Sequence, residues 1–164
     1  RGGMAIRFDE NDVRPMGRTA AGVRAIRLKD GDEVVAAVRA TDEDAAVLTV
    51  TENGYGKRTR IGEYSVQNRG GQGLKTYQIT QKTGEIVGAK KVTGEEDILL
   101  VSDDGTIIRM EAGSISLLGR ATQGVRLMRP AEGAHVVAMA RTEREASEEE
   151  TAEPGESAVE NTEE

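Results

Sequence analysis

The sequence predicts an all-β protein assembled from a repeated unit of about four strands. Three observations predict this class: markers that recur every 51 residues, Asn-Gly and Asp-Gly turns between apolar runs, and a poor helical pattern throughout residues 1–144. The chain has 164 residues, of which only 2% are aromatic. Val, Ile, Leu, Met and Ala must therefore build the core.

The repeat appears in three sets of markers that share one offset. Glycines recur 51 residues apart at Gly22, Gly73 and Gly124, and again at Gly3, Gly54 and Gly105. The run "VLTVTENG" from Val47 matches "ILLVSDDG" from Ile98 at the same distance. Independent markers at one spacing indicate three units of roughly residues 1–44, 45–95 and 96–144.

Each unit contains runs with the character of strands. "VLTV-TENG-YGKRT" and "ILLV-SDDG-TIIRM" are typical of hairpins closed by Asn-Gly and Asp-Gly turns. "GVRAIRL" from Gly22, "GLKTYQI" from Gly73 and "GVRLMR" from Gly124 alternate in character, and "DEVVAAVRA", "GEIVGAKKV" and "AHVVAMART" form a fourth group. Four-stranded repeats of this length indicate propeller-like blades, about three of them here.

The net charge of −7 is concentrated in a C-terminal tail. Residues 145–164 contain nine Glu and no Lys or Arg, which leaves 20 acids against 22 bases in residues 1–144. The body therefore carries about two positive charges. The tail has too few large apolar residues to bury a core, so we expect it to be disordered.

Basic residues accompany the repeated glycines. We expect those glycines to have a structural role, at positive φ or where two chains approach closely. The cations beside them are Arg18, Arg24, Arg69, Lys75, Arg120 and Arg126. No acidic residue lies within "GRTAAGVR", "NRGGQGLK" or "GRATQGVR". A radial array of such cations forms a stripe that favours a polyanion, and the alternative is plain solvated surface.

A second, patchier set of basic residues follows the hairpin turns. It comprises Arg7, Lys57, Arg58, Arg60 and Arg109. These side chains either extend the stripe or guard strand edges against aggregation. The pattern does not choose between the two.

Duplex DNA is the polyanion that fits best. Single-strand binders stack bases on aromatic side chains, which are scarce here. Contacts to phosphates along a curved rim need no sequence preference, and they favour bent DNA.

No catalytic or metal-binding pattern is present. The Gly-rich stretch does not fit a P-loop, the chain lacks Cys, and the acidic clusters lack EF-hand spacing. His135 is the only histidine, and its repeat partners are Glu33 and Gly84. We therefore expect no catalytic residue, no bound cofactor and no metal in this chain, and no apolar run is long enough for a membrane helix.

The stretch "QNRGGQG" resembles a known motif. Gln67, Asn68, Arg69, Gly70, Gly71, Gln72 and Gly73 are similar to the box Q-R-R-G-G-K-G of the C-terminal domain of the DNA gyrase A subunit. "IRFDENDVRPMGRTAAGV", "YGKRT", "TIIRM" and "GRATQGVRL" resemble later blades of that domain. Asn68 and Gln72 replace two cations of the box, as in its degenerate copies. The resemblance covers residues 1–144, with an acidic tail after them.

The resemblance implies a β-pinwheel that wraps duplex DNA around a basic rim and supports ATP-dependent negative supercoiling. It implies a bacterial, cytoplasmic, nucleoid-associated A2B2 holoenzyme, in which the partners are the rest of the A subunit together with the gyrase B protein. That parent is a type II topoisomerase whose catalytic tyrosine, ATP and Mg²⁺ lie in other domains. Tyr55, Tyr64 and Tyr77 do not have that tyrosine's sequence context.

Two alternatives to this interpretation stay open. One is the related C-terminal domain of the topoisomerase IV A subunit. The other is a propeller-like protein-interaction module that binds no nucleic acid. The family's whole domain has about six blades, so we interpret the chain as a C-terminal fragment of such a domain.

Overall fold

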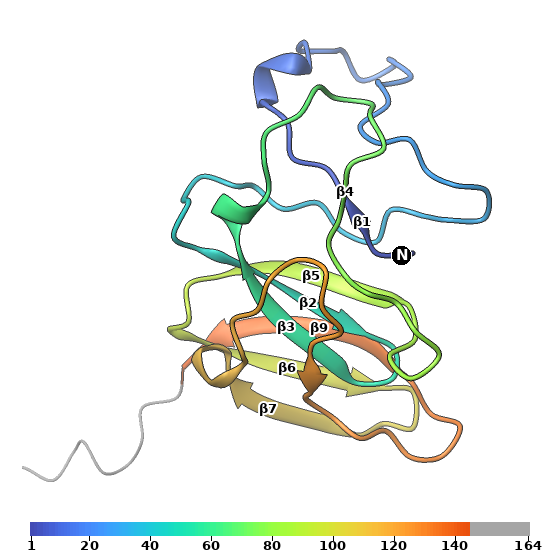
Figure 1. Ribbon diagram of the computed structural model, residues 1–164, viewed down its shortest axis with the longest axis vertical. Helices are drawn as coiled ribbons and strands as arrows, with labels where there is room; N and C mark the ends of the chain where they lie inside the picture. The colour runs from blue at the N-terminus through green and yellow to red at the C-terminus, as the bar shows by residue number, and fades with distance from the viewer. Residues whose placement is uncertain (145–164) are drawn as a thin grey trace, which may run out of the picture.

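The computed structural model describes residues 1–144, which are all-β apart from three single-turn 3-10 helices (Figure 1). The strands are β1 (Met4–Ala5), β2 (Ala46–Thr51), β3 (Tyr55–Arg60), β4 (Leu74–Lys75), β5 (Ile86–Val92), β6 (Glu96–Ser102), β7 (Ile107–Glu111), β8 (Val125–Arg126) and β9 (Val136–Glu143). The helical turns are η1 (Glu10–Asp12), η2 (Ile61–Glu63) and η3 (Ala112–Ser114). The expected disorder of residues 145–164 concerns a segment outside the described residues.

The sheets are antiparallel and exchange strands between units. One has the order β5-β2-β3-β8, the second β7-β6-β9, and the third consists of β1 and β4. β8 comes from the third unit but pairs with β3 of the second, with Tyr55 opposite Arg126. In the same way β4 of the second unit pairs with β1 of the first, with Met4 opposite Lys75. The second and third units therefore each contribute a short strand to the sheet of the unit before them.

The predicted all-β, propeller-like class is confirmed, with one refinement. Among the described sheets only β5-β2-β3-β8 has four strands, because the next unit supplies the fourth. The third unit keeps three of its four strands in the β7-β6-β9 sheet, and the first contributes only β1 to its sheet. The predicted hairpins at β2–β3 and β6–β7 are present, and so are the predicted strands at β5 and β9.

Two predicted strands of the first unit do not form. Residues 22–28 and 32–40 have no strand assignment, although their counterparts contribute β4, β8, β5 and β9. Of these counterparts, β4 and β8 pair with β1 and β3, while β5 and β9 pair with β2 and β6. Within residues 1–144 no strand pairs with 22–28 or 32–40. Without a neighbour to receive their backbone hydrogen bonds, these segments stay irregular.

The repeated glycines sit where one unit touches the next. Gly73 has a φ of 76°, and a Cβ there would lie 2.3 Å from the Ala5 carbonyl oxygen. Gly124 has a φ of 71°, and its Cβ would lie 2.5 Å from the Gly56 oxygen. Both the positive φ and the close approach that the sequence predicts are therefore present.

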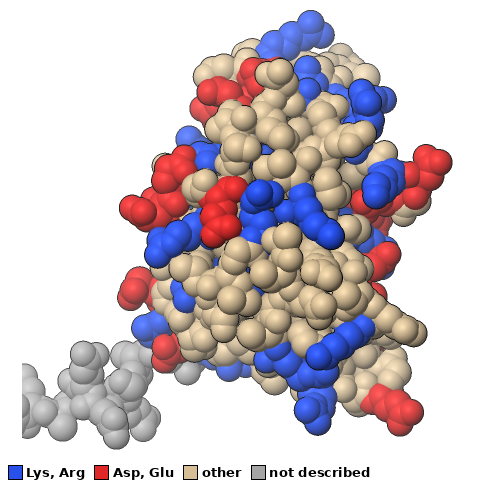
Figure 2. Space-filling model, viewed as in Figure 1, with Lys and Arg blue, Asp and Glu red and all other residues tan. Residues whose placement is uncertain are grey.

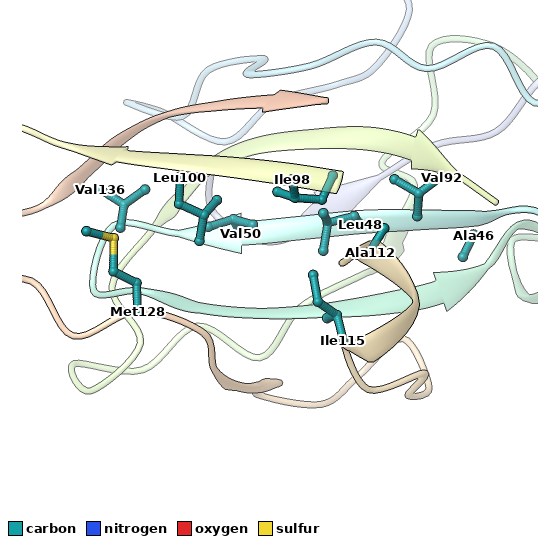
Figure 3. Close-up of a cluster of buried hydrophobic side chains, with 10 residues drawn as sticks. All are labelled: Ala46, Leu48, Val50, Val92, Ile98, Leu100, Ala112, Ile115, Met128 and Val136. Carbon is teal, nitrogen blue, oxygen red and sulfur yellow. The ribbon is translucent and has the colours of Figure 1, made fainter. Parts of the chain in front are cut away.

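The main core lies between the β5-β2-β3-β8 sheet and the β7-β6-β9 sheet (Figure 3). Leu48 and Val50 lie on the same face of β2, and Ile98 and Leu100 lie on the same face of β6. All four side chains have no exposed surface. This packing holds the second and third units together, and with them the loops at their shared boundary.

The opposite face of β2 borders a cavity of about 670 Å³ toward the first unit. Val47 and Thr49 line it from β2, and Phe8, Ile26 and Val38 line it from the first unit. The first unit packs less tightly because its segments lack the sheet that orders the other two.

Gly73 and Gly22 offer a matched test of the strand exchange. Both have a positive φ, but nothing lies within 4 Å of a Cβ at Gly22. We expect Gly22→Ala to cost about 1–2 kcal/mol from backbone strain alone. Gly73→Ala should cost roughly 1–3 kcal/mol more, because its methyl group collides with the Ala5 carbonyl. Urea unfolding of both variants measures the difference, and equal costs would contradict the close approach.

Candidate nucleic-acid interface

The short exchanged strands place one cation of each unit at an equivalent point. Lys75 ends β4 and Arg126 ends β8, and both side chains are exposed. Arg24 holds the same repeat position in the first unit and is also exposed. Because alternate residues of a strand face opposite sides, Leu74 and Val125 turn inward while the cations turn to solvent.

The box-like loop packs against the first unit through its main chain. The amide of Gly70 donates to the Ala25 carbonyl at 2.8 Å, and the amide of Arg27 donates to the Gly71 carbonyl at 2.8 Å. Gly70 has a φ of 82°, which its repeat partners Thr19 and Ala121 do not share. All three units turn at this point, and Gly70 gives this copy a turn of different backbone conformation.

The arginine of the loop reaches back to the unit before it. The Arg69 guanidinium donates to the Arg24 carbonyl and, at 3.2 Å, to the Asp12 carbonyl. One unit later, Arg120 donates to the Lys75 carbonyl at 3.2 Å. The same contact thus brings Arg69 to Arg24 and Arg120 to Lys75. The cations form pairs that bridge the unit boundaries.

None of the first set of cations has an ion pair with a carboxylate in residues 1–144. The set is Arg18, Arg24, Arg69, Lys75, Arg120 and Arg126. Figure 2 shows Lys and Arg side chains in separate groups down the visible face, with uncharged surface between them. On this face the Lys and Arg side chains are grouped, and Asp and Glu side chains lie beside some of the groups.

Arg7 and Arg58 of the second set join neighbouring units. Arg58 Nε donates to the Ile115 carbonyl at 2.7 Å, and its Nη2 donates to the Gly113 carbonyl at 2.8 Å. Arg7 Nη1 donates to the Tyr64 carbonyl, the equivalent of Ile115, and to the Ile61 carbonyl, and Arg7 also pairs with Glu43. Each guanidinium holds the helical turn of the next unit, a role that neither sequence hypothesis included.

Arg109 and Arg60 occupy different surroundings. Arg109 is bound within its own sheet, where Nε donates to Asp97 at 2.8 Å and Nη2 to the Glu143 carbonyl at 3.0 Å. The hydrogen bond from Arg109 contributes to neutralising the buried Asp97 carboxylate. Arg60, at the end of β3, is exposed.

The burial of Lys57 excludes both roles that the sequence left open for it, an extension of the basic stripe and an exposed guard of a strand edge. Its side chain is 0% exposed, and Nζ donates to the Gly119 carbonyl at 2.7 Å and to Thr122 Oγ1 at 3.0 Å. The Arg120 carbonyl is a third acceptor, and Nζ lies 5.0 Å from the centroid of the Tyr77 ring. The ammonium therefore ties down the loop that carries Arg120, and it does not face solvent.

Burial lowers the pKa of Lys57 to about 8, since the charged form loses its hydration. The nearby Arg120 guanidinium lowers this pKa further, while Glu63 opposes the shift. Burial has the opposite effect on Tyr77, whose pKa it raises because the neutral phenol is favoured. The Tyr77 hydroxyl donates to the Gln123 carbonyl at 2.5 Å, so it also anchors this loop.

Sequence reasoning did not select two residues near Arg126. Tyr55 accepts a hydrogen bond from Arg126 Nη2 at 2.5 Å, and its ring centroid lies 4.6 Å from the guanidinium carbon. Lys82 Nζ lies 5.5 Å from the same centroid. The repeat contained a signal for both residues. Met4 and Thr106 occupy the position of Tyr55 in the other units, and glycines occupy the position of Lys82, so both residues are specific to the second unit.

The described residues give no sign of metal chemistry or of a membrane span. No group of three or more His, Asp and Glu side chains in residues 1–144 is placed to hold a metal ion. No helix in that range is long and apolar enough to cross a bilayer. His135 Nδ1 lies 3.8 Å from Asp103 Oδ2, and its own backbone amide donates to the same carboxylate.

A family model described as the DNA gyrase C-terminal domain, a β-propeller, matches residues 1–41, 45–93 and 96–143. The chain belongs to this family. It is 51% identical over 141 residues to the DNA gyrase A subunit of Staphylococcus epidermidis, and 49% identical over 148 residues to that of Staphylococcus aureus. These alignments cover 85% and 88% of this chain but 16% of each relative.

Solved structures of the gyrase family and of a related enzyme share the fold. The structure of a DNA gyrase A C-terminal domain superposes with a TM-score of 0.79 at 32% identity, over 86% of this chain and 48% of that one. The C-terminal domain of DNA topoisomerase IV superposes with a TM-score of 0.81 at 25% identity, over 87% and 44%. This gyrase-family domain therefore corresponds to less than half of each solved domain.

The Lys57 contact predicts a pH dependence of stability for this gyrase-family domain. Between pH about 8 and 10.5, the unfolded chain holds a proton that folded Lys57 has released. The free energy of unfolding should therefore rise with pH in this window, by up to about 1.4 kcal/mol per unit. Lys57→Met should lack this rise, and it should also cost about 1–3 kcal/mol near pH 7 because three oxygen acceptors lose their donor.

Urea unfolding of the parent chain and of Lys57→Met at about pH 7.5 and about pH 9.5 measures the change in unfolding free energy. Both proteins contain the same tyrosines, so the contribution of tyrosine titration cancels between them. Lys29→Met, at an exposed lysine, is the matched control and should follow the parent chain. Parallel pH profiles for the parent and Lys57→Met would contradict the assigned role of Lys57.

Proposed function

We propose that this chain forms part of the DNA-wrapping domain in the A subunit of a gyrase, and that it binds duplex DNA through phosphate contacts. The chain spans about a sixth of the curated relatives that it matches, which are gyrase A subunits. The activity of the whole enzyme and its partners are therefore included here as part of the proposal.

One observation carries the proposal: equivalent, solvent-facing cations recur at the unit boundaries without carboxylate partners in residues 1–144. The Arg69 and Arg120 guanidinium groups are bound to the main-chain carbonyls of Arg24 and Lys75, so each boundary carries two cationic residues in contact. Such pairs repel each other unless a polyanion neutralises them. A phosphate backbone passing over the boundaries satisfies each pair in turn.

The aromatic residues favour a duplex over a single strand. Tyr55 and Tyr64 are 6% exposed, and Tyr77 is 0% exposed. These rings support the fold and present no flat surface for stacking a base. No described helix is long enough to enter the major groove, so contact with phosphates remains the chemistry that the surface offers.

The proposed parent is a bacterial, cytoplasmic, nucleoid-associated type II topoisomerase of A2B2 composition. In it, this domain bends duplex DNA around its rim and supports ATP-dependent negative supercoiling. The cutting tyrosine and the ATP and Mg²⁺ sites are assigned to other domains, and this segment is assigned no catalytic group and no cofactor. The greater identity to the gyrase structure, 32% against 25%, favours gyrase over topoisomerase IV.

Binding to a labelled duplex should depend steeply on salt. Six phosphate contacts predict a slope of log K against log salt of roughly −5. Fluorescence anisotropy of the full chain across about 50–200 mM salt measures the slope. Lys75→Gln should reduce its magnitude by about 0.9, because one counterion fewer is released.

Arg58→Gln is the matched control for this measurement. It also removes one cation, but Arg58 is bound to the carbonyls of the next unit. We expect Arg58→Gln to lower the urea midpoint and to leave the salt slope unchanged. Equal slopes for Lys75→Gln and the parent chain would refute the assignment of Lys75, and weak, salt-insensitive binding would refute the whole proposal.

The acidic tail should compete with DNA for the cations. Its nine Glu face a body with about two net positive charges, so deletion of residues 145–164 should tighten binding to the duplex. A chain with Gln in place of those nine Glu tests whether charge, rather than length, is responsible. Unchanged affinity in both variants would exclude competition by the tail.

A further inference from the structure

A basic pocket of about 300 Å³ opens at the boundary of the second and third units. Its polar lining residues are Asn53, Lys82, Arg126 and His135, and small residues between positions 130 and 134 complete its wall. None of the lining residues is acidic. The pocket lies beyond the end of β8, so it continues the line of cations described above.

The two cations of the pocket are held in place by one buried ring. Tyr55 is 6% exposed, and its hydroxyl accepts the hydrogen bond from Arg126 at 2.5 Å. Its ring lies 4.6 Å from the Arg126 guanidinium carbon and 5.5 Å from Lys82 Nζ, both within cation–π range. The remaining guanidinium hydrogens, and those of the ammonium, are available to an anion.

The cations of the pocket have no carboxylate partner in the described chain, although the exposed Glu132 lies between the lining residues Ala131 and Gly133. Neither Lys82 nor Arg126 forms an ion pair with a carboxylate among residues 1–144. Asp103 accepts from the His135 amide, and Asp104 accepts from Ser102 and Thr106. Two like charges fixed on one ring repel each other, and an oxyanion between them removes this repulsion.

We propose that Lys82 and Arg126, oriented by Tyr55, form a seat for a single phosphate group of the DNA backbone. The inference rests on the proposed function and adds Lys82 to the interface. Arg126 supplies the planar donors that suit a phosphate, and Lys82 supplies a second positive charge. Asn53 also lines the pocket, and its amide nitrogen donates to the Gln81 and Lys82 carbonyls, which fixes the turn that carries Lys82.

The seat occurs at one boundary only within the described chain. At the preceding boundary the residues equivalent to Tyr55 and Lys82 are Met4 and Gly31, so Lys75 there lacks the aromatic ring and the cation that Lys82 supplies. The phosphate at the second boundary is therefore held more tightly than its counterpart, and it fixes where the duplex passes over the units.

Two titrations of the full chain test the seat. In the first, anisotropy of a labelled duplex across about 50–200 mM salt compares Lys82→Gln with Lys29→Gln, a matched change at an exposed lysine. Lys82→Gln should weaken binding about threefold or more and reduce the slope by about 0.9, and Lys29→Gln should do neither. In the second, NMR follows the amides of Gly133, Ala134 and His135 while inorganic phosphate is added. These amides should shift in the parent chain and not in Lys82→Gln.

The outcomes separate the seat from the proposed function. Steep salt dependence with equal slopes for both variants would overturn the seat and leave DNA binding intact. If inorganic phosphate shifts the amide signals but Lys82→Gln leaves duplex affinity unchanged, the pocket does not contact the DNA and binds free phosphate instead. Salt-insensitive duplex binding would refute the proposed function. The phosphate titration alone would then show whether the pocket binds a phosphate group. Tyr55→Phe keeps the ring and should weaken duplex binding less than Lys82→Gln.

Discussion

The pairing of a short strand from one unit with the sheet of the unit before it is the constraint on which the rest of the structure depends. β8 covers the edge of β3, and β4 covers β1, although each exchanged strand has only two residues. Such a short strand adds few hydrogen bonds, so its place is secured by what surrounds it. The glycines let the two backbones touch, Arg58 holds the next helical turn, and Lys57 holds the next loop. The same pairing fixes the position of Lys75 and Arg126.

The features that sequence reasoning predicted correctly are those that a backbone position dictates. Gly73 and Gly124 recur because a Cβ would collide with a carbonyl of the neighbouring unit, so the glycine spacing reports the unit spacing directly. The segments 22–28 and 32–40 show the limit of such patterns. Their side chains alternate as strand residues do, but a strand also needs a partner, and the partner is a long-range property that alternation does not contain.

The roles of the cations could be predicted only in part for a related reason. Arg58 and Lys75 are both basic, recur at fixed positions and have few acidic neighbours in sequence. The structure commits Arg58 to two carbonyl oxygens of the next unit and leaves Lys75 exposed. Carbonyl groups are present in every residue, so a sequence gives no sign that one of them will accept from a particular arginine. Lys57 escaped prediction in the same way, because its three acceptors come from residues about 60 positions away.

The strand exchange also bears on how a protein of this kind gains or loses repeats over evolutionary time. A copied unit brings a strand for its predecessor on one side and an open edge for its successor on the other. When such a copy is inserted between two units, every edge finds a partner, and no new interface has to be invented. Gene duplication in multiples of the repeat is therefore compatible with the fold, while an insertion within an exchanged strand disrupts its pairing. Single-copy features such as the Tyr55 ring with its two cations can then arise in one unit without disturbing the others.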